Sequence, residues 1–131
     1  MKRLLLIFIL LFTATFYVSA QDEDDQDDTE TVRDKMAEYI QQKLKLSDQE
    51  AKKFRPAFVQ YFKEWRETIR DNRTDKLVLK QKVAELQIRY RGRFKDIIGE
   101  QKSNQVFNEQ RNFITELRQL RQNRMKSRRR T

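Results

Sequence analysis

Apolar residues recur along most of the chain at the spacing of α-helices. One stripe lies within residues 31–44, and a second, rich in aromatic side chains, lies within residues 54–69. Two more follow, within residues 79–97 and 106–120. Their members recur every three or four positions, the period of a helix with one buried face. Because only one proline and two glycines interrupt the chain, the pattern predicts an all-α fold of about four helices.

The two middle helices, predicted over about residues 48–71 and 75–98, have matched lengths and a short polar connection. Matched length and a short link predict an antiparallel helical hairpin. Pro56 falls inside the first of these helices and removes one backbone hydrogen bond, so we expect a kink there while the apolar stripe continues. The second helix should end near Gly99. The N-terminal and C-terminal helices are expected to be shorter than this hairpin.

The run Leu46-Ser47-Asp48-Gln49-Glu50 is the clearest local signal in the chain. The Ser47 side chain can accept a hydrogen bond from the N–H of Glu50, while the Glu50 carboxylate reaches back to the N–H of Ser47. This reciprocal arrangement is a capping box, and it predicts the start of the long second helix. For the next helix, either Thr74 or Asn72 is available as a cap.

The first twenty residues, MKRLLLIFILLFTATFYVSA, have the organisation of an export signal. Lys2 and Arg3 precede an unbroken apolar run, and the small residues Val18 and Ala20 precede a predicted cut after Ala20. The alternative, an uncleaved membrane anchor, stays open, although residues 4–20 are short for a hydrocarbon core roughly 30 Å thick. A bacterial lipoprotein is excluded because the chain has no cysteine to carry the lipid. The sequence therefore predicts a periplasmic protein.

Charge divides the remainder into three parts. Residues 21–30 hold seven acids and no base, which predicts a disordered acidic leader. Residues 31–124 form the predicted helical domain, and residues 125–131 are expected to be a disordered basic tail. A basic helical protein would ordinarily suggest a nucleic-acid partner, but export removes that partner. Anionic lipid headgroups, lipopolysaccharide phosphates and negatively charged unfolded polypeptides remain as candidates.

Composition excludes several kinds of chemistry. The absence of both cysteine and histidine rules out a catalytic thiol, a Ser-His triad and a structural zinc site. Two glycines leave no phosphate-binding loop. Paired carboxylates remain chemically possible, but none is set among apolar residues that would raise its pKa. We therefore expect no enzyme, no cofactor and no metal site, apart from weak calcium ligation by the acidic leader.

Two stretches, LKLSDQEAKKFRPAFVQYFKEWR and RYRGRFKDIIGEQKSNQVFNEQRNFITELRQLR, resemble the LTXXQ-motif group of exported Spy/CpxP-like proteins. The nearest likeness is to small secreted proteins labelled sensors of ECF-type sigma factors or periplasmic heavy-metal sensors. The first motif of the group corresponds here to Leu46, Ser47 and Glu50. The second corresponds loosely to Ile97, Ile98 and Gln101, and an aromatic-x-Pro element to Phe54 and Pro56.

The resemblance implies a kinked helical hairpin, often paired into a cradle-shaped dimer, that binds unfolded chains without ATP through a mixed apolar and basic surface. The candidate client-binding residues on the two middle helices are Phe58, Phe62, Trp65, Arg66, Arg70, Arg89, Arg91 and Arg93. The competing interpretation is that the aromatic members are simply the core between those helices.

Three functions follow as hypotheses. The first is an ATP-independent chaperone or envelope-stress modulator that binds unfolded or partner polypeptides. The second is a dedicated regulator that binds the periplasmic part of a membrane signalling protein. The third is a binder of the anionic envelope surface that uses the arginine-rich end. Whether the protein is a monomer or a homodimer stays open.

Overall fold

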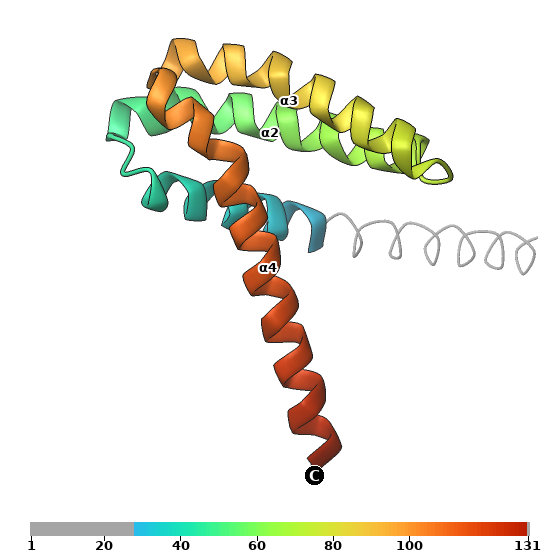
Figure 1. Cartoon of the computed structure of the whole chain (residues 1–131). Coiled ribbons are helices and arrows are strands. Elements are labelled where there is room, and N and C mark those ends of the chain that lie inside the picture. The colour runs from blue at the N-terminus through green and yellow to red at the C-terminus, as the bar shows by residue number, and fades with distance from the viewer. Residues whose placement is uncertain (1–27, 131) are drawn as a thin grey trace, which may run out of the picture. The chain divides into compact units, whose positions relative to one another are not determined.

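The computed structural model describes residues 28–130, and all regular structure within that range is helical. A helix over residues 28–43 is followed by α2 (Asp48–Asp71), α3 (Lys76–Ile98) and α4 (Glu100–Arg130) (Figure 1). The predicted all-α fold is therefore confirmed. The chain divides into two compact units, Met1–Asp34 and Lys35–Thr131, and the buried core of the described residues belongs to the second.

The first helix reaches further toward the N-terminus than predicted. Residues 28–30, predicted as part of the disordered acidic leader, are already helical. The predicted export signal and most of that leader lie outside the described residues. In the described part of the first unit, Nε of Arg33 pairs with Oδ1 of Asp34 at 3.2 Å. Within residues 28–130, no helix is both long and apolar enough to cross a membrane.

α2 and α3 pack together as the predicted antiparallel hairpin (Figure 1). Side chains cap both helix ends at the connection. The backbone N–H and the side-chain amide of Asn72 donate to the Thr68 carbonyl at 3.2 and 2.9 Å. Oδ1 of Asp75 accepts from two backbone N–H groups in the first turn of α3, at 3.1 and 3.2 Å. Asp75 therefore caps α3, rather than Thr74 or Asn72, and its charge opposes the positive end of the helix.

The capping box predicted at the start of α2 is present. The N–H of Glu50 donates to Oγ of Ser47 at 3.2 Å, and the N–H of Ser47 donates to Oε1 of Glu50 at 3.1 Å. α2 then continues without interruption through Pro56, which is exposed to solvent. The carbonyl of Lys52, which Pro56 leaves without its helical partner, also belongs to an exposed residue. The kink at Pro56 stays a prediction.

Six aromatic side chains from the hairpin lie in the core of the described residues. The largest buried ones are Tyr61, Tyr90, Phe54, Phe58 and Phe94. Ring centroids of Phe54 and Phe94 lie 5.1 Å apart, and those of Tyr61 and Tyr90 lie 5.4 Å apart, distances at which aromatic rings attract one another. The helix over residues 28–43 adds Met36, Ala37 and Ile40, the turn after it adds Leu44, and the first half of α4 adds Val106. Four helices therefore contribute to one core.

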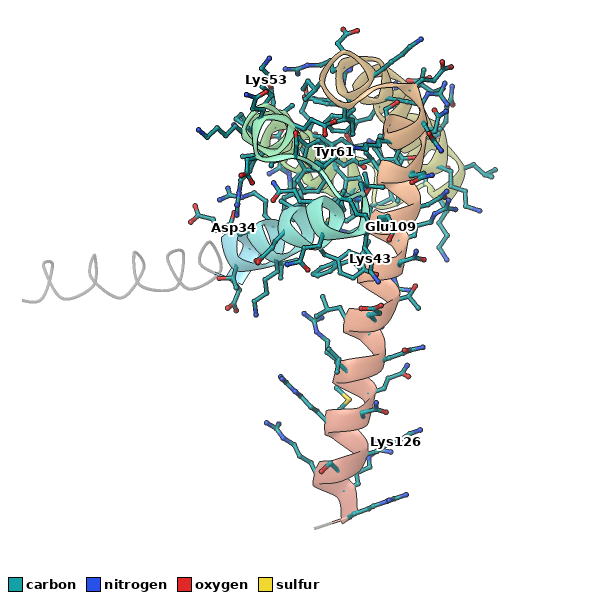
Figure 2. The ribbon with its side chains drawn as sticks, turned by 90° about the vertical axis from the view of Figure 1, so that its left-hand side faces the viewer. Asp34, Lys43, Lys53, Tyr61, Glu109 and Lys126 are labelled. Atoms are coloured by element: carbon teal, nitrogen blue, oxygen red, sulfur yellow. The ribbon has the colours of Figure 1, made fainter. Side chains whose placement is uncertain are left out.

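α4 is the longest of the described helices, with 31 residues, so the expectation of a shorter C-terminal helix is wrong. It begins directly after Gly99, whose N–H bonds the Lys95 carbonyl at 2.9 Å and whose φ is +85°. Residues 125–130, predicted as a disordered tail, continue the helix. No glycine or proline follows Gly99, arginine favours helices, and the basic last turn opposes the negative helix end. Figure 2 shows Lys126 on the half of α4 that extends away from the other helices.

Candidate binding surface

The aromatic residues proposed to bind clients are mostly buried in the structure. Phe58 is fully buried and Phe62 is 3% exposed. Phe58 stacks on Phe54 with ring centroids 5.6 Å apart, and the ring centroids of Phe62 and Trp65 are also 5.6 Å apart. Phe58 and Phe62 are therefore core residues in this fold, as the competing interpretation expected, since the helix over residues 28–43 and α4 complete the core around the hairpin. Trp65 alone of the three is half-buried.

The five proposed arginines are all exposed, but three of them hold local contacts. Arg93 donates to Gln60 at 3.1 Å, and Arg89 pairs with Glu64 at 3.6 Å. Both guanidinium groups also lie over the Tyr90 ring, at 5.1 and 5.8 Å from its centroid. These two arginines therefore brace α3 against α2 at the surface, where each contact contributes modestly.

The remaining three arginines do not form one patch with the aromatic residues. Arg70 pairs with Asp71 at 3.3 Å at the end of α2. Arg66 and Arg91 are exposed residues on different helices of the hairpin. The structure therefore does not assemble the eight proposed residues into a single mixed surface. Two belong to the core, two brace the hairpin, and the others are dispersed.

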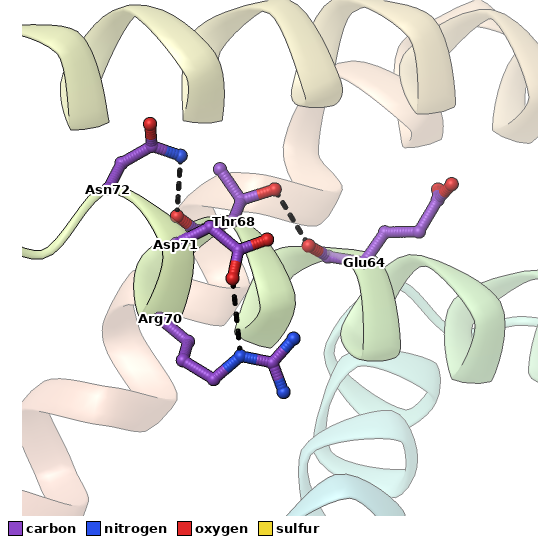
Figure 3. A network of polar contacts seen from close by, with 5 residues as sticks. All are labelled: Glu64, Thr68, Arg70, Asp71 and Asn72. Atoms are coloured by element: carbon purple, nitrogen blue, oxygen red, sulfur yellow. Dashed lines mark hydrogen bonds and ion pairs between the residues drawn. The ribbon is translucent and has the colours of Figure 1, made fainter.

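A groove of about 450 Å³ lies between the C-terminal half of α2 and the middle of α3. Its lining is mostly polar: Glu64, Glu67, Thr68, Asp71, Asn72, Lys82, Glu85, Leu86 and Arg89. Several polar groups of this lining already hydrogen-bond within α2 and its C-terminal cap (Figure 3). The Thr68 hydroxyl donates to the Glu64 carbonyl at 2.7 Å, and the side-chain amide of Asn72 donates to the Thr68 carbonyl. Among the described residues, no cluster of three or more metal-ligating side chains is present.

A buried polar contact joins three helices. The hydroxyl of Tyr61 donates to Oε1 of Gln110 at 2.7 Å, and Nε2 of Gln87 approaches the same hydroxyl at 3.4 Å. Burial raises the pKa of Tyr61 to about 12. This contact was not predicted from the sequence. The signal available was Gln110 itself, a polar residue on the apolar stripe between Val106 and Phe113.

A second unpredicted contact connects the capping box to α4. Nζ of Lys102 lies 3.2 Å from Oε1 of Glu50, the same oxygen that accepts from the N–H of Ser47. The hydrogen bond from the Ser47 N–H lowers the pKa of Glu50 most, and the hydrogen bond from Lys102 lowers it further. Glu50 therefore contacts two helices, at the start of α2 and in the first turn of α4.

The structure does assemble a mixed apolar and basic surface, but on α4 and the helix over residues 28–43. The rings of Tyr39 and Phe113 meet edge to face at 5.5 Å, and the Tyr39 hydroxyl donates to Glu116 at 3.2 Å. Nζ of Lys43 lies 5.4 Å from the centre of the Tyr39 ring. Figure 2 shows Lys43 beside α4, near the height of Glu109.

Apolar side chains continue along α4 beyond this contact. Leu117 is half-buried and Leu120 is 57% exposed. Together Tyr39, Phe113, Leu117 and Leu120 form what we call the α4 strip. Because residues three and four apart share one side of a helix, its α4 members form a row that no described helix covers at Leu120. The strip was not predicted, since Tyr39 and Phe113 are 74 positions apart in the sequence.

Beyond the strip, every charged residue of α4 is basic. Residues 121–130, here called the cationic end, contain six bases and no acid, and all ten are exposed. Residues 118–130 hold seven bases. The ion pairs of Arg33, Arg70, Arg89 and Lys102 all lie outside this segment. An apolar strip therefore adjoins a strongly positive helix end.

Comparisons with protein-family models, with curated proteins and with solved structures find no match to this chain.

Proposed function

We propose that this protein is a non-catalytic binding protein that holds segments of other polypeptides against the α4 strip. It would act as an exported, ATP-independent chaperone or envelope-stress modulator, in keeping with the predicted export signal and the resemblance to Spy/CpxP-like proteins. The observation that carries the proposal is the α4 strip itself, with Leu120 more than half exposed beside Phe113 and Leu117.

The chemistry of the strip suits loose binding of polypeptides. Exposed apolar residues on a small protein commonly mark a binding surface when they are contiguous and bordered by charge. Lys43 lies over Tyr39 at one end of the strip, and Arg121 follows Leu120 at the other. Cations at both ends would draw in negatively charged segments, and the apolar row would then hold them. The resemblance implies the same mechanism for a surface on the hairpin, whereas the proposal assigns it to the α4 strip.

The test measures how well residues 21–131 suppress the aggregation of an unrelated unfolding protein in the absence of nucleotide. All buried residues of the described chain lie between Met36 and Gln110, and residues 21–131 keep every one of them. The variant Leu117→Gln/Leu120→Gln removes the apolar row. The matched control is Leu77→Gln/Ile88→Gln, which changes two other exposed apolar residues, 79% and 61% exposed, on α3.

The proposal expects suppression by the wild-type chain, a several-fold loss in the Leu117→Gln/Leu120→Gln variant, and little change in the control. Equal losses in both variants would show that general surface hydrophobicity is responsible. Failure of the wild-type chain at several-fold molar excess would remove the chaperone function. A single saturable partner, captured without any effect on generic clients, would instead favour the dedicated regulator.

A further inference from the structure

The cationic end of α4 has a charge pattern distinct from that of the α4 strip. Its bases are Arg121, Arg124, Lys126, Arg128, Arg129 and Arg130. Every residue from Arg118 to Arg130 is exposed. Among the described residues, Arg121, Arg124 and Lys126 take part in no ion pair. A dense positive charge is therefore held on an ordered helix, and at Arg121, Arg124 and Lys126 no acid of the described residues neutralises it.

The arrangement of these bases around the helix narrows the choice of partner. Arg121, Arg124 and Arg128 follow one another at the spacing of a single helix face, and the face is the one that carries Val106 and Gln110 into the core. Lys126 and the last two arginines fall on other sides. Met125, 63% exposed, is the one large apolar side chain of the segment. Because charge surrounds the helix, it lacks the broad apolar face that a helix needs to bind in a protein groove.

We propose that the cationic end docks the protein on the surface of a bilayer containing anionic phospholipids. A layer of lipid phosphates can meet bases on several sides of a helix tip at once, and each base near such a surface adds to the attraction. Nucleic acid offers the same phosphate chemistry, but the export predicted from residues 1–20 separates the chain from it. The inference does not depend on polypeptide binding at the α4 strip: Arg121 borders the strip, but the other five bases of the cationic end lie beyond it.

The experiment measures binding of residues 21–131 to vesicles of about one part phosphatidylglycerol to two parts phosphatidylcholine, by co-sedimentation at low and at physiological salt. Removing residues 1–20 prevents the predicted signal from binding lipid itself. The test variant is Arg121→Gln/Arg124→Gln/Lys126→Gln. The matched control, Lys52→Gln/Lys53→Gln/Arg55→Gln, removes the same charge from exposed positions of α2. Figure 2 shows Lys53 and Lys126 on these two helices.

The proposal expects the α4 variant to bind the anionic vesicles about tenfold or more weakly than wild type at low salt, and the α2 control to bind nearly as wild type. Vesicles of phosphatidylcholine alone should not bind either chain. Circular dichroism should show that both variants remain folded, since all six substituted residues are exposed. The Leu117→Gln/Leu120→Gln variant should keep its vesicle binding even if it loses chaperone activity, which separates the two proposals.

Three results would overturn the inference. Equal losses in the α4 and α2 variants would mean that net charge alone is responsible. No binding of the wild-type chain to anionic vesicles would mean that the cationic end has another role. Tighter, α4-dependent binding to soluble poly-glutamate than to vesicles would identify an acidic polypeptide as the partner. A chain ending at Leu120 provides a second check, because it lacks the cationic end completely and must lose the same binding.

Discussion

The hydroxyl of Tyr61 in α2 donates a 2.7 Å hydrogen bond to Oε1 of Gln110 in α4, inside an otherwise almost entirely apolar core. A buried polar pair of this kind contributes little when both partners are replaced, but the loss of one partner leaves the other without a hydrogen bond. The pair therefore specifies how α4 lies against the hairpin more than it stabilises the fold.

Replacing one member of this pair should be more costly than replacing both. Tyr61→Phe leaves the Gln110 carbonyl buried without a donor, so we expect a loss of about 1–3 kcal/mol in the free energy of unfolding. Adding Gln110→Leu should recover part of that loss, and the two effects should be clearly less than additive. Urea unfolding of the two single variants and the double variant measures this. Strict additivity would show that the hydrogen bond does not couple the two residues.

The capping box gives a second prediction, for the start of α2. Ser47→Ala removes the oxygen that accepts from the N–H of Glu50, and should lower the free energy of unfolding by about 1 kcal/mol. Aggregation suppression by the α4 strip should change only as far as folding does. A variant with unchanged stability but no client binding would show that the LSDQE element is a recognition site instead.

Glu50 should make stability depend on pH in the acidic range. Its pKa in the folded chain lies below the ordinary value of 4.5, because the Ser47 N–H and Lys102 favour the charged form. The stability contributed by this charge is therefore fully present above pH 4.5 and is lost as the pH falls through the lower folded-state value. Glu50→Gln keeps an acceptor for the Ser47 N–H but removes the charge.

Urea unfolding at neutral pH and well below pH 4.5 tests this. The difference in stability between wild type and Glu50→Gln should be larger at neutral pH and should narrow in acid. Glu38→Gln is the control, since Glu38 is an exposed acid with no ion pair to a described residue. An unchanged difference at the two pH values would show that the Glu50 charge does not stabilise the fold.

The burial of the hairpin aromatics gives a fourth prediction. Phe58→Ala should destabilise the fold by about 3–5 kcal/mol, because it leaves a cavity among packed rings. Leu120→Ala should change stability by no more than about 0.5 kcal/mol, because its side chain is mostly exposed. Chemical denaturation of both variants measures the contrast. Similar small effects would place Phe58 at a surface, as the client-binding hypothesis required.

The two glycines should respond in opposite directions to alanine. Gly92 lies inside α3, and a Cβ there would meet nothing within 4 Å, so Gly92→Ala should stabilise the protein by roughly 0.5–1 kcal/mol. Gly99 has φ +85° and ψ 168°, a backbone state that is essentially restricted to glycine. Gly99→Ala should therefore destabilise by about 1–3 kcal/mol. Thermal unfolding of the pair distinguishes them, and a stabilising Gly99→Ala would contradict the backbone argument.

The hairpin was predictable because its signals are local. Ser47 and Glu50 are three positions apart, Gly99 stands where the α3 stripe ends, and the apolar spacing reports helices directly. The extension of α4 through Arg130 was missed because a polar, arginine-rich composition was interpreted as disorder, although arginine favours helices and no breaker follows Gly99.

The binding surface was harder to predict because a stripe shows that a helix face is apolar, but not what covers it. Phe58 and Phe62 are covered once the helix over residues 28–43 and α4 join the hairpin. Tyr39 meets Phe113 only through that arrangement, and Lys102 reaches Glu50 in the same way. Contacts between helices distant in sequence leave no periodic trace in either one.

One residue, Gly99, separates the end of α3 at Ile98 from the start of α4 at Glu100. Because the connection is a single residue, the orientation of α4 relative to α3 cannot change unless a turn of helix unwinds or Gly99 adopts another backbone conformation. Beyond the hydrogen bond between Tyr39 and Glu116, residues 117–130 rise by about 21 Å at 1.5 Å per residue. The helix is therefore a spacer of set length, and whatever surface Arg130 touches is kept roughly 20 Å away from the aromatic core.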